Sequence, residues 1–303
     1  MNTRPRNRIE CAVEVVRVKY AVVGGDMRAA LLCAMLAREG ARVYSFALEK
    51  AEMSPQVIKA GCMQGCVYAA DCVILPVPTE RGGLLVTPMS DSVIRMSELI
   101  SALWPGQVII GGHLSDASCA QAQREGLCIE DMLLRPDYVM GNAALTAEGA
   151  VMRLMEEGAL SLMGRAILIC GWGRIGRLLA QKLGALGARV TIAARGRDDR
   201  AQARAMGFSA LDYSALETEL PAFSCIVNTV PARVLTDAML CMAAEGAIIM
   251  ELASPPGGFD RALAENIGLH VVSAPGLPGV CAAQSAAELM KSEIYAILGE
   301  QEE

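Results

Sequence analysis

The chain has 303 residues, 53% of them hydrophobic and 20% charged, and its formal net charge is −6 at pH 7. This length suits two domains with large cores, and the negative charge argues against a general nucleic-acid binder. No uncharged apolar segment reaches the roughly 18 residues of a membrane span, and no apolar run follows the basic residues 1–10. We therefore expect a cytoplasmic protein with no membrane segment and no signal peptide.

Residues 1–141 predict a Rossmann-like substrate domain. Its first strand is expected at 19–23, and Asp26 is a good N-cap for the helix after the Gly24-Gly25 turn. This turn lacks the third glycine of a nucleotide fingerprint, and Asp26 would put a carboxylate where a phosphate should lie. We therefore expect this domain to have lost its nucleotide and to offer its strand-end loops to a substrate.

The rest of this domain alternates short strands and helices. Further strands are expected at 42–46, 72–75, 108–110, 127–129 and 138–140, with helices at 91–103 and after Ser115. The segment 79–90 is rich in Gly, Thr and Pro, which is typical of a loop. Most of the 11 cysteines lie in apolar runs, as buried reduced thiols do. Cys62 and Cys66 have no second pair near them, so we expect no metal site.

Residues 142–160 predict a connecting helix, and 161–282 predict an NAD(P)-binding Rossmann domain. Strands of the second domain are expected at 166–170, 189–193, 225–228, 247–252 and 270–272. A last helix, at about 282–298, is expected to return to the first domain, which residues 283–303 would complete. The predicted fold is therefore α/β, with two doubly wound Rossmann-like domains and a cleft between them.

The motif G-x-G-x-x-G at Gly171, Gly173 and Gly176 stands between a buried strand and an amphipathic helix. Gly171 lets the chain turn sharply, Gly173 lets a pyrophosphate approach the backbone, and Gly176 lets the helix pack on the sheet. The N–H groups that begin the helix would face the phosphates. A second strand follows about 20 residues on, as a dinucleotide unit requires, so we predict a nicotinamide dinucleotide site here.

The end of that second strand decides between NAD and NADP. An NAD site usually carries an acidic residue there, whereas this chain has Arg195 and Arg197, which would pair with a 2′-phosphate. We therefore favour NADP; a longer strand would bring Asp198 or Asp199 to the ribose and favour NAD. The expected cofactor contacts are Gly171, Gly173, Arg174, Ile175, Gly176, Arg195, Arg197, Asn228, Thr229, Val230 and Pro231.

Several short motifs together resemble the family of dipicolinate synthase dehydrogenase subunits, the A-subunits of that enzyme. They are GGDMR near the start, TAEG at 146–149, GWGRIG, NTVP at 228–231, ELASPPGG at 251–258 and APGLPG at 274–279. The resemblance spans nearly the whole chain and implies a pyridine-nucleotide dehydrogenase of sporulating bacteria, in the cytoplasm of the mother cell. It implies as substrate a small dicarboxylate of the lysine pathway, 4-hydroxy-tetrahydrodipicolinate or the dihydrodipicolinate formed from it. It also implies a flavoprotein-like partner, the B-subunit of dipicolinate synthase, and we expect a homo-oligomer.

The layout is also similar to that of D-2-hydroxyacid and alanine dehydrogenases. A D-2-hydroxyacid dehydrogenase needs a substrate-clamping arginine after the strand that ends near Leu252, and a proton-relaying histidine further on. This chain has Ala253-Ser254-Pro255 at the first place, and His270 is expected within a strand. These departures argue against 2-hydroxyacid chemistry.

A diacid substrate needs arginine forks, hydroxyls or glycine-rich backbone donors. The residues that would contact it are Asp26, Arg28, Thr87, Ser90, Asn142, Thr146, Ala253, Ser254 and Gly276. The catalytic candidates are His113, Arg28 and Glu148; His113 follows a strand and has a free pKa near the operating range. Each has a plainer alternative: Arg28 as a solvated helix residue, His113 as a bystander, and Glu148 as a charge that complements the helix dipole.

Two further functions stay open at this point. One is a different two-domain NADP dehydrogenase that acts on a keto or amino acid. The other is a nucleotide-binding protein without turnover.

Overall fold

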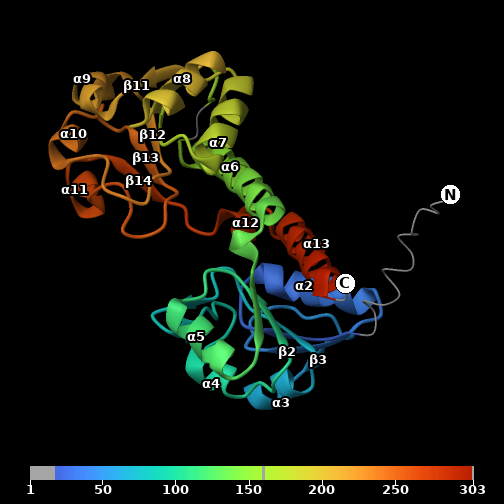
Figure 1. The fold of residues 1–303 in the computed structure, drawn as a ribbon. Helices are drawn as coiled ribbons and strands as arrows, with labels where there is room; N and C mark the ends of the chain where they lie inside the picture. Colours follow the sequence, from blue (N-terminus) through green and yellow to red (C-terminus); the bar gives the residue numbers. More distant parts are fainter. Residues whose placement is uncertain (1–17, 159–160, 302–303) are drawn as a thin grey trace, which may run out of the picture. The chain divides into compact units, whose positions relative to one another are not determined.

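The computed structural model describes residues 18–158 and 161–301. Three stretches lie outside that range, among them the basic N-terminus and the end of the predicted connecting helix: residues 1–17, 159–160 and 302–303. The chain divides into two compact units: residues 1–141 with 283–303, and residues 142–282. Each unit is an α/β layer structure built on one six-stranded sheet (Figure 1).

The sheet of the first unit has the strand order β3-β2-β1-β4-β7-β8, and every pairing in it is parallel. Its strands are β1 (Lys19–Val23), β2 (Arg42–Phe46), β3 (Ile58–Lys59), β4 (Cys72–Ile74), β7 (Val108–Gly111) and β8 (Cys128–Asp131). The strand order reverses between β1 and β4, and ligands of such sheets bind at the carboxyl ends of the strands at this point.

Helices cover both faces of this sheet, which is why the central strands are continuous apolar runs. The helices are α2 (Met27–Arg38), α3 (Met63–Tyr68), α4 (Met96–Ile100), α5 (Asp116–Arg124) and α13 (Ala283–Gln301). One core cluster joins α2 and α13 to the sheet, and another joins α3, α4 and α5 to its other face. Asp26 and Ser115 cap α2 and α5 as expected, each accepting a backbone N–H.

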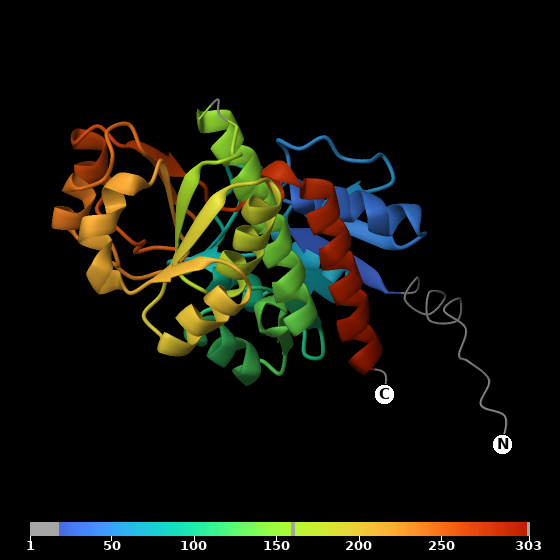
Figure 2. The same cartoon turned by 90° about the horizontal axis from the view of Figure 1, so that it is seen from above.

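The last helix packs against α2 of the first unit, as Figures 1 and 2 show. Arg135, just before α6 (Pro136–Gly158), donates from Nε to Glu293 of α13 at 2.7 Å and from Nη1 to Glu300 at 2.9 Å. The Glu293 side chain is only 8% exposed, whereas that of Glu300 is 58% exposed. Arg135 therefore binds α13 through two ion pairs, one with the buried Glu293 and one with the exposed Glu300.

Three sequence expectations in this unit are wrong. The strand expected at 138–140 lies inside α6, which Pro136 begins; proline suits the first turn of a helix. The helix expected at 91–103 is reduced to the short α4. The loop expected at 79–90 contains a small antiparallel hairpin, β5 (Glu80–Arg81) with β6 (Leu84–Leu85).

The second unit repeats the architecture with the order β11-β10-β9-β12-β13-β14, again all parallel. Its strands are β9 (Ala166–Cys170), β10 (Arg189–Ala193), β11 (Ser209–Leu211), β12 (Cys225–Asn228), β13 (Ile248–Glu251) and β14 (His270–Ser273). Its helices include α7 (Arg174–Ala185), α8 (Arg197–Ala205), α9 (Leu216–Glu219), α10 (Asp237–Cys241), α11 (Arg261–Asn266) and α12 (Leu277–Cys281). The order reverses between β9 and β12, which places the predicted phosphate turn at this sheet's own switch point.

Candidate functional site

The turn after β9 has the geometry that the glycine motif predicts. Gly171 has φ +107°, and a Cβ there would lie 2.5 Å from Oγ1 of Thr229, in the loop after β12. A Cβ on Gly176 would lie 2.4 Å from the carbonyl oxygen of Gly171. Both positions therefore require glycine, one for the bend and one for the contact between turn and helix.

The start of α7 is open to a ligand. Gly173 is its N-cap and offers no side-chain cap, and a Cβ there would meet nothing within 4 Å. Arg174 and Ile175 begin the helix. The first N–H groups of a helix have no partner within the helix and attract anions. Uncapped donors beside a bare backbone fit the diphosphate of a dinucleotide.

The ribose end of this site carries the two predicted arginines. β10 ends at Ala193, and Arg195 and Arg197 both lie exposed directly after it. Neither side chain has an ion-pair partner among residues 18–158 and 161–301. Asp198 and Asp199 fall in the first turn of α8 and not in a prolonged strand. The longer strand on which the NAD alternative depended is therefore not formed, but Asp199 of α8 still lies close to Gly196.

The loop after β12 is held by buried hydrogen bonds. Asn228 is fully buried; its Nδ2 donates to Val230 O at 2.9 Å and to Glu251 Oε1 at 2.7 Å, and its Oδ1 accepts from Val230 N at 3.2 Å. Thr229 donates from Oγ1 to Cys170 O at 2.8 Å. The side chains predicted to touch the cofactor are thus engaged inside the protein, and this loop offers a ligand its backbone, with Pro231 exposed beyond.

Glu251, which the sequence analysis did not single out, organises the neighbouring loop. Its Oε1 also accepts from Ala253 N at 2.9 Å, and its Oε2 accepts from Gly258 N at 2.7 Å. This carboxylate therefore fixes the loop that includes Ser254 at the carboxyl edge of the sheet. The available signal was an acidic residue at the end of a strand directly before the proline-glycine run. Gly276, with φ +66°, turns the chain after β14 into α12.

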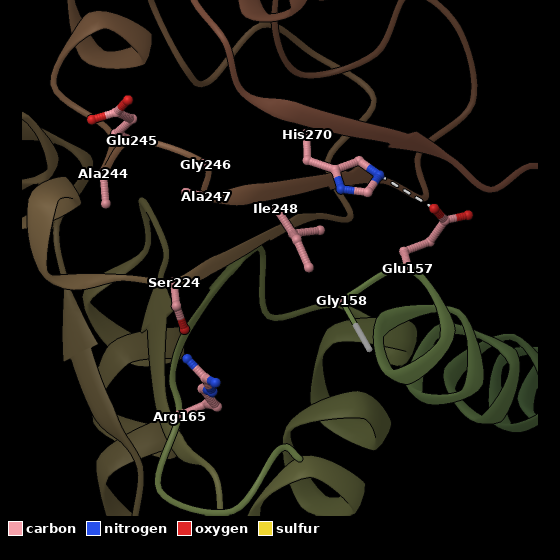
Figure 3. Close-up of a pocket in the computed structure, with 10 residues that line it drawn as sticks. All are labelled: Glu157, Gly158, Arg165, Ser224, Ala244, Glu245, Gly246, Ala247, Ile248 and His270. Atoms are coloured by element: carbon pink, nitrogen blue, oxygen red, sulfur yellow. Dashed lines mark hydrogen bonds and ion pairs between the residues drawn. The ribbon is translucent and has the colours of Figure 1, made fainter. Parts of the chain in front are cut away.

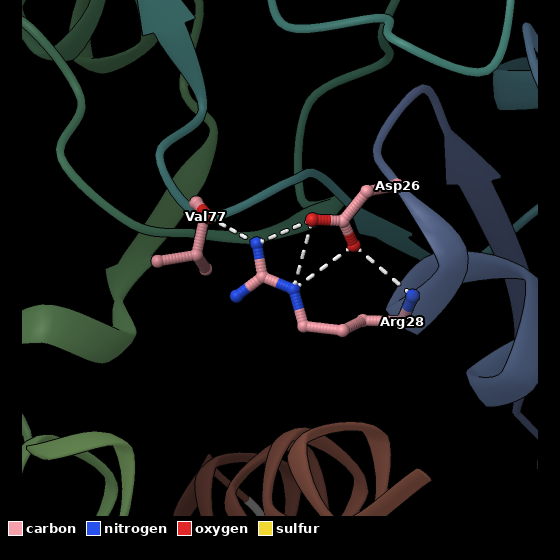
Figure 4. A network of polar contacts seen from close by, with 3 residues as sticks. All are labelled: Asp26, Arg28 and Val77. Atoms are coloured by element: carbon pink, nitrogen blue, oxygen red, sulfur yellow. Dashed lines mark hydrogen bonds and ion pairs between the residues drawn. The ribbon is translucent and has the colours of Figure 1, made fainter. Parts of the chain in front are cut away.

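In the first unit, the buried Arg28 pairs with the partly exposed Asp26 at the switch point between β1 and β4 (Figure 4). Arg28 donates from Nη2 to Asp26 Oδ2 at 2.8 Å and to Val77 O at 2.7 Å, and from Nε to Asp26 Oδ1 at 2.9 Å. Burial opposes its charge, but the hydrogen bonds to Asp26 outweigh this and raise the pKa of Arg28. Arg28 is therefore a rigid, permanently charged group and not a solvated helix residue.

The Gly24-Gly25 turn of the first unit has no room for a diphosphate. A Cβ on Gly24 would lie 3.0 Å from Leu85 and from Val86 O, and Gly25 N donates to Val86 O at 3.0 Å. The β5–β6 hairpin thus covers the place that corresponds to the candidate diphosphate site of the second unit. The Asp26 side chain meanwhile accepts the backbone N–H of Arg28, in the first turn of α2.

The remaining substrate candidates have internal partners. Thr87 donates to Ser92 O at 2.8 Å, and Ser90 accepts from Ser92 N at 3.0 Å. Ser90 also lines a polar cavity of ≈ 400 Å³ with Glu49, Lys50, Asp91 and Ser92. In the second unit, Thr146 donates to Asn142 O at 2.7 Å, and Glu148 pairs with Lys182 at 2.8 Å.

His113 lies exposed after β7 in a left-handed backbone conformation, with φ +61°. The backbone N–H of His113 donates to Asp131 Oδ2 at 2.9 Å, and the backbone N–H of Ser115 donates to Glu80 Oε1 at 2.9 Å. Two carboxylates that the sequence analysis missed therefore hold this loop from β8 and from the hairpin. A non-glycine residue at positive φ persists only where its surroundings fix it.

The cavity in Figure 3, of ≈ 300 Å³, is not the coenzyme site. It lies where strands of the second sheet begin, beside Arg165, Ser224 and His270, whereas coenzymes bind where the strands end. His270 is in β14, as expected, and its Nε2 lies 3.2 Å from Glu157 Oε2. His270 therefore lies at the opposite end of the strands from the carboxyl edge, where a proton-relaying histidine would be needed.

Among residues 18–158 and 161–301, no helix is both long and apolar enough to span a bilayer. No group of three or more His, Cys, Asp or Glu side chains in these residues could hold a metal ion.

Two family models match successive parts of the chain. Residues 19–133 match the family of N-terminal domains of the dipicolinate synthase A-subunit. Residues 130–251 match the NAD-binding domain of D-isomer specific 2-hydroxyacid dehydrogenases. The second unit is therefore a nicotinamide-dinucleotide domain of the dehydrogenase type. The match ends at Glu251 and does not include residues 252–282 of this unit.

Whole-chain relatives point the same way. The chain is 27% identical to the dipicolinate synthase A-subunit of Bacillus subtilis (strain 168), over 93% of this chain and 96% of the relative. The crystal structure of the dipicolinate synthase A-subunit from Bacillus halodurans superposes with a TM-score of 0.81 at 26% identity, covering 93% and 98% of the two chains. L-alanine dehydrogenase, at 13% identity and a TM-score of 0.63 over 92% and 88%, shares the fold. Over nearly its whole length, the chain is thus a relative of the dipicolinate synthase A-subunit, as its motifs predicted.

Proposed function

We propose that the chain is the NADP-dependent dehydrogenase component of a dipicolinate synthase. The observation that carries this proposal is the open start of α7 behind Gly173, followed by two exposed arginines after β10. The first feature suits a diphosphate, and the second suits a 2′-phosphate better than a bare ribose. The names of the relatives supply the substrate class.

The proposed reaction oxidises dihydrodipicolinate, formed from 4-hydroxy-tetrahydrodipicolinate by loss of water, to pyridine-2,6-dicarboxylate. A ring carbon loses a hydride with both electrons of its C–H bond, and a neighbouring atom loses a proton. Bound NADP would supply the acceptor for the hydride. Aromatisation makes the step favourable, so the chain's own residues need only bind the diacid, orient it and accept a proton.

Arg28 is the residue best suited to hold a carboxylate. It is fixed at the switch point of the first sheet by Asp26 and by Val77 O. Its side-chain hydrogen bonds to Asp26 and Val77 come from Nε and Nη2, and in Figure 4 no bond joins Nη1 to either residue, so we propose that this donor serves a ligand. A preformed charged donor costs little ordering on binding. The backbone N–H groups around Ser254 and Gly276 are proposed as further contacts.

His113 is proposed as the group that accepts the proton. It follows β7 at the carboxyl edge of the first sheet, and Asp131 fixes its backbone while its ring stays exposed. A neutral imidazole suits this task near pH 7. Glu148 is a weaker candidate, because its carboxylate already pairs with Lys182. The proposal also includes the flavoprotein-like B-subunit as partner, a homo-oligomer, and a role in spore formation on a branch of lysine synthesis.

Activity can be tested with purified chain, NADP⁺ and 4-hydroxy-tetrahydrodipicolinate, with and without the B-subunit. We expect NADPH and the pyridine product, followed by their absorbance, to form in equal amounts. Arg28→Lys should lower the rate, because lysine cannot reproduce the fixed fork. Coenzyme reduction with a keto or amino acid, and none with the diacid, would support the first alternative function. Binding of NADPH with no product in any mixture would support a nucleotide-binding protein without turnover.

A further inference from the structure

One carboxylate lies at the ribose end of the proposed NADP site. Asp199, in the first turn of α8, stands over Gly196, since a Cβ on that glycine would lie 2.8 Å from Asp199 Oδ2. Gly196 directly follows Arg195, so Asp199 lies beside the backbone next to that arginine. Left uncompensated, the charge of Asp199 would repel a 2′-phosphate and favour the free hydroxyl of NAD.

Arg177, in the first turn of α7, faces the carboxylate of Asp199. Its Nε donates to Trp172 O at 2.9 Å, its guanidinium lies 5.7 Å from the centre of the Trp172 ring, and its Nη2 lies 3.8 Å from Asp199 Oδ1. The hydrogen bond and the cation–π contact hold the side chain over the turn. Arg177 thus contacts Trp172 in the glycine turn and Asp199 beside the end of β10.

We propose that Arg177 sets the preference for NADP by neutralising Asp199. This inference rests on the proposed NADP-dependent function and names the residue that makes its specificity possible. Asp199 and Arg177 form a charge-balanced pair, so that Arg195 and Arg197 meet the 2′-phosphate without a competing carboxylate. The role is one of screening: Arg177 need not touch the 2′-phosphate itself.

The pair is too exposed to matter for folding. The two side chains are 46% and 44% exposed, and ion pairs of this kind add little stability. We expect the pair to affect coenzyme binding more than folding. The 2′-phosphate carries a charge of about −1.5 to −2 near pH 7, so it responds strongly to Asp199 and to the neighbouring arginines. Specificity can therefore change while the fold does not.

A double-mutant cycle on the full chain tests this proposal. Affinities for NADPH and NADH are measured by titration of the wild type, Arg177→Met, Asp199→Asn and the double variant, using the fluorescence of the reduced coenzyme. Arg177→Met should lower the preference for NADPH by about tenfold, the factor for about 1.4 kcal/mol. Asp199→Asn should keep or raise the preference. The double variant should match Asp199→Asn, because without the carboxylate there is nothing to screen.

Arg177→Lys controls for the loss of charge and should retain most of the preference, and circular dichroism checks folding. An unchanged preference in Arg177→Met overturns the proposal. An equal loss with and without Asp199 also overturns it, because that result means direct contact with the 2′-phosphate. A wild type that binds neither coenzyme, or that prefers NADH, instead contradicts the proposed function from which the inference starts.

Discussion

Under the proposed function, Arg195 is the residue expected to contact the 2′-phosphate of NADP most directly. It lies exposed after β10 with no ion-pair partner among the described residues. Arg195→Asp should weaken NADP binding by about tenfold to a hundredfold, the range for losing a hydrogen bond to a charged group. Binding of NAD should change far less, because NAD lacks the 2′-phosphate. Isothermal titration with both coenzymes measures the two effects.

Arg124→Asp is the matched control for this change, since Arg124 is exposed on α5 of the first unit and the variant alters net charge equally. It should leave both affinities unchanged. Equal losses for NADP and NAD in Arg195→Asp would remove the reason for preferring NADP.

Among single residues, the sequence predicted those whose constraints come from neighbours close in the chain. Gly171, Gly173 and Gly176 could be assigned because one turn and its helix contain all three. Glu251 was missed because one of its partners, Asn228, comes from the neighbouring strand β12, although Gly258 lies in the loop that follows Glu251. The pairing of Arg177 with Asp199 joins two helices and leaves no pattern in either. Side-chain networks of this kind depend on tertiary contacts that spacing along the chain does not encode.

Among the elements, the buried parallel strands were predicted best. Continuous apolar runs bounded by glycine place them within a residue or two, as for β1 and β9. The start of α6 was predicted wrongly because Tyr138-Val139-Met140 is too short an apolar run to distinguish strand from helix. The β5–β6 hairpin was missed because its strands are two residues each. Yet this hairpin closes the first unit's glycine turn to phosphate.

The attachment of α13 is the element whose energetics can be tested most cleanly. Glu293→Ala leaves Arg135 without its buried partner, and loss of one member of such a pair costs about 3–5 kcal/mol. We expect a smaller loss, about 2 kcal/mol, because Glu300 still binds the same arginine. Urea unfolding monitored by circular dichroism gives the free energy of unfolding.

Glu300→Ala provides the internal comparison on the same arginine. Its side chain is mostly exposed, so its removal should cost about 0–1 kcal/mol. Equal losses in the two variants would show that burial does not distinguish the two ion pairs.

On the scale of the whole molecule, the chain repeats one architecture with different strand-end turns. Both sheets reverse their strand order at the centre and open a glycine turn there. In the first unit, Asp26 and the hairpin fill that turn, and Arg28 is buried beside it. In the second unit, the turn stays bare and the helix behind it is uncapped. The proposed division into a substrate unit and a coenzyme unit follows from these local differences.

Coenzyme titration of the wild type against Gly176→Ala tests the central claim most directly. A Cβ at Gly176 would lie 2.4 Å from Gly171 O and must displace the turn, whereas a Cβ at Gly299 in α13 meets nothing within 4 Å. NADPH should bind the wild type and Gly299→Ala alike and should lose most of its affinity for Gly176→Ala, with all three proteins folded. Failure of the wild type to bind either coenzyme, or undiminished binding by Gly176→Ala, would contradict the assignment of this turn as the dinucleotide site.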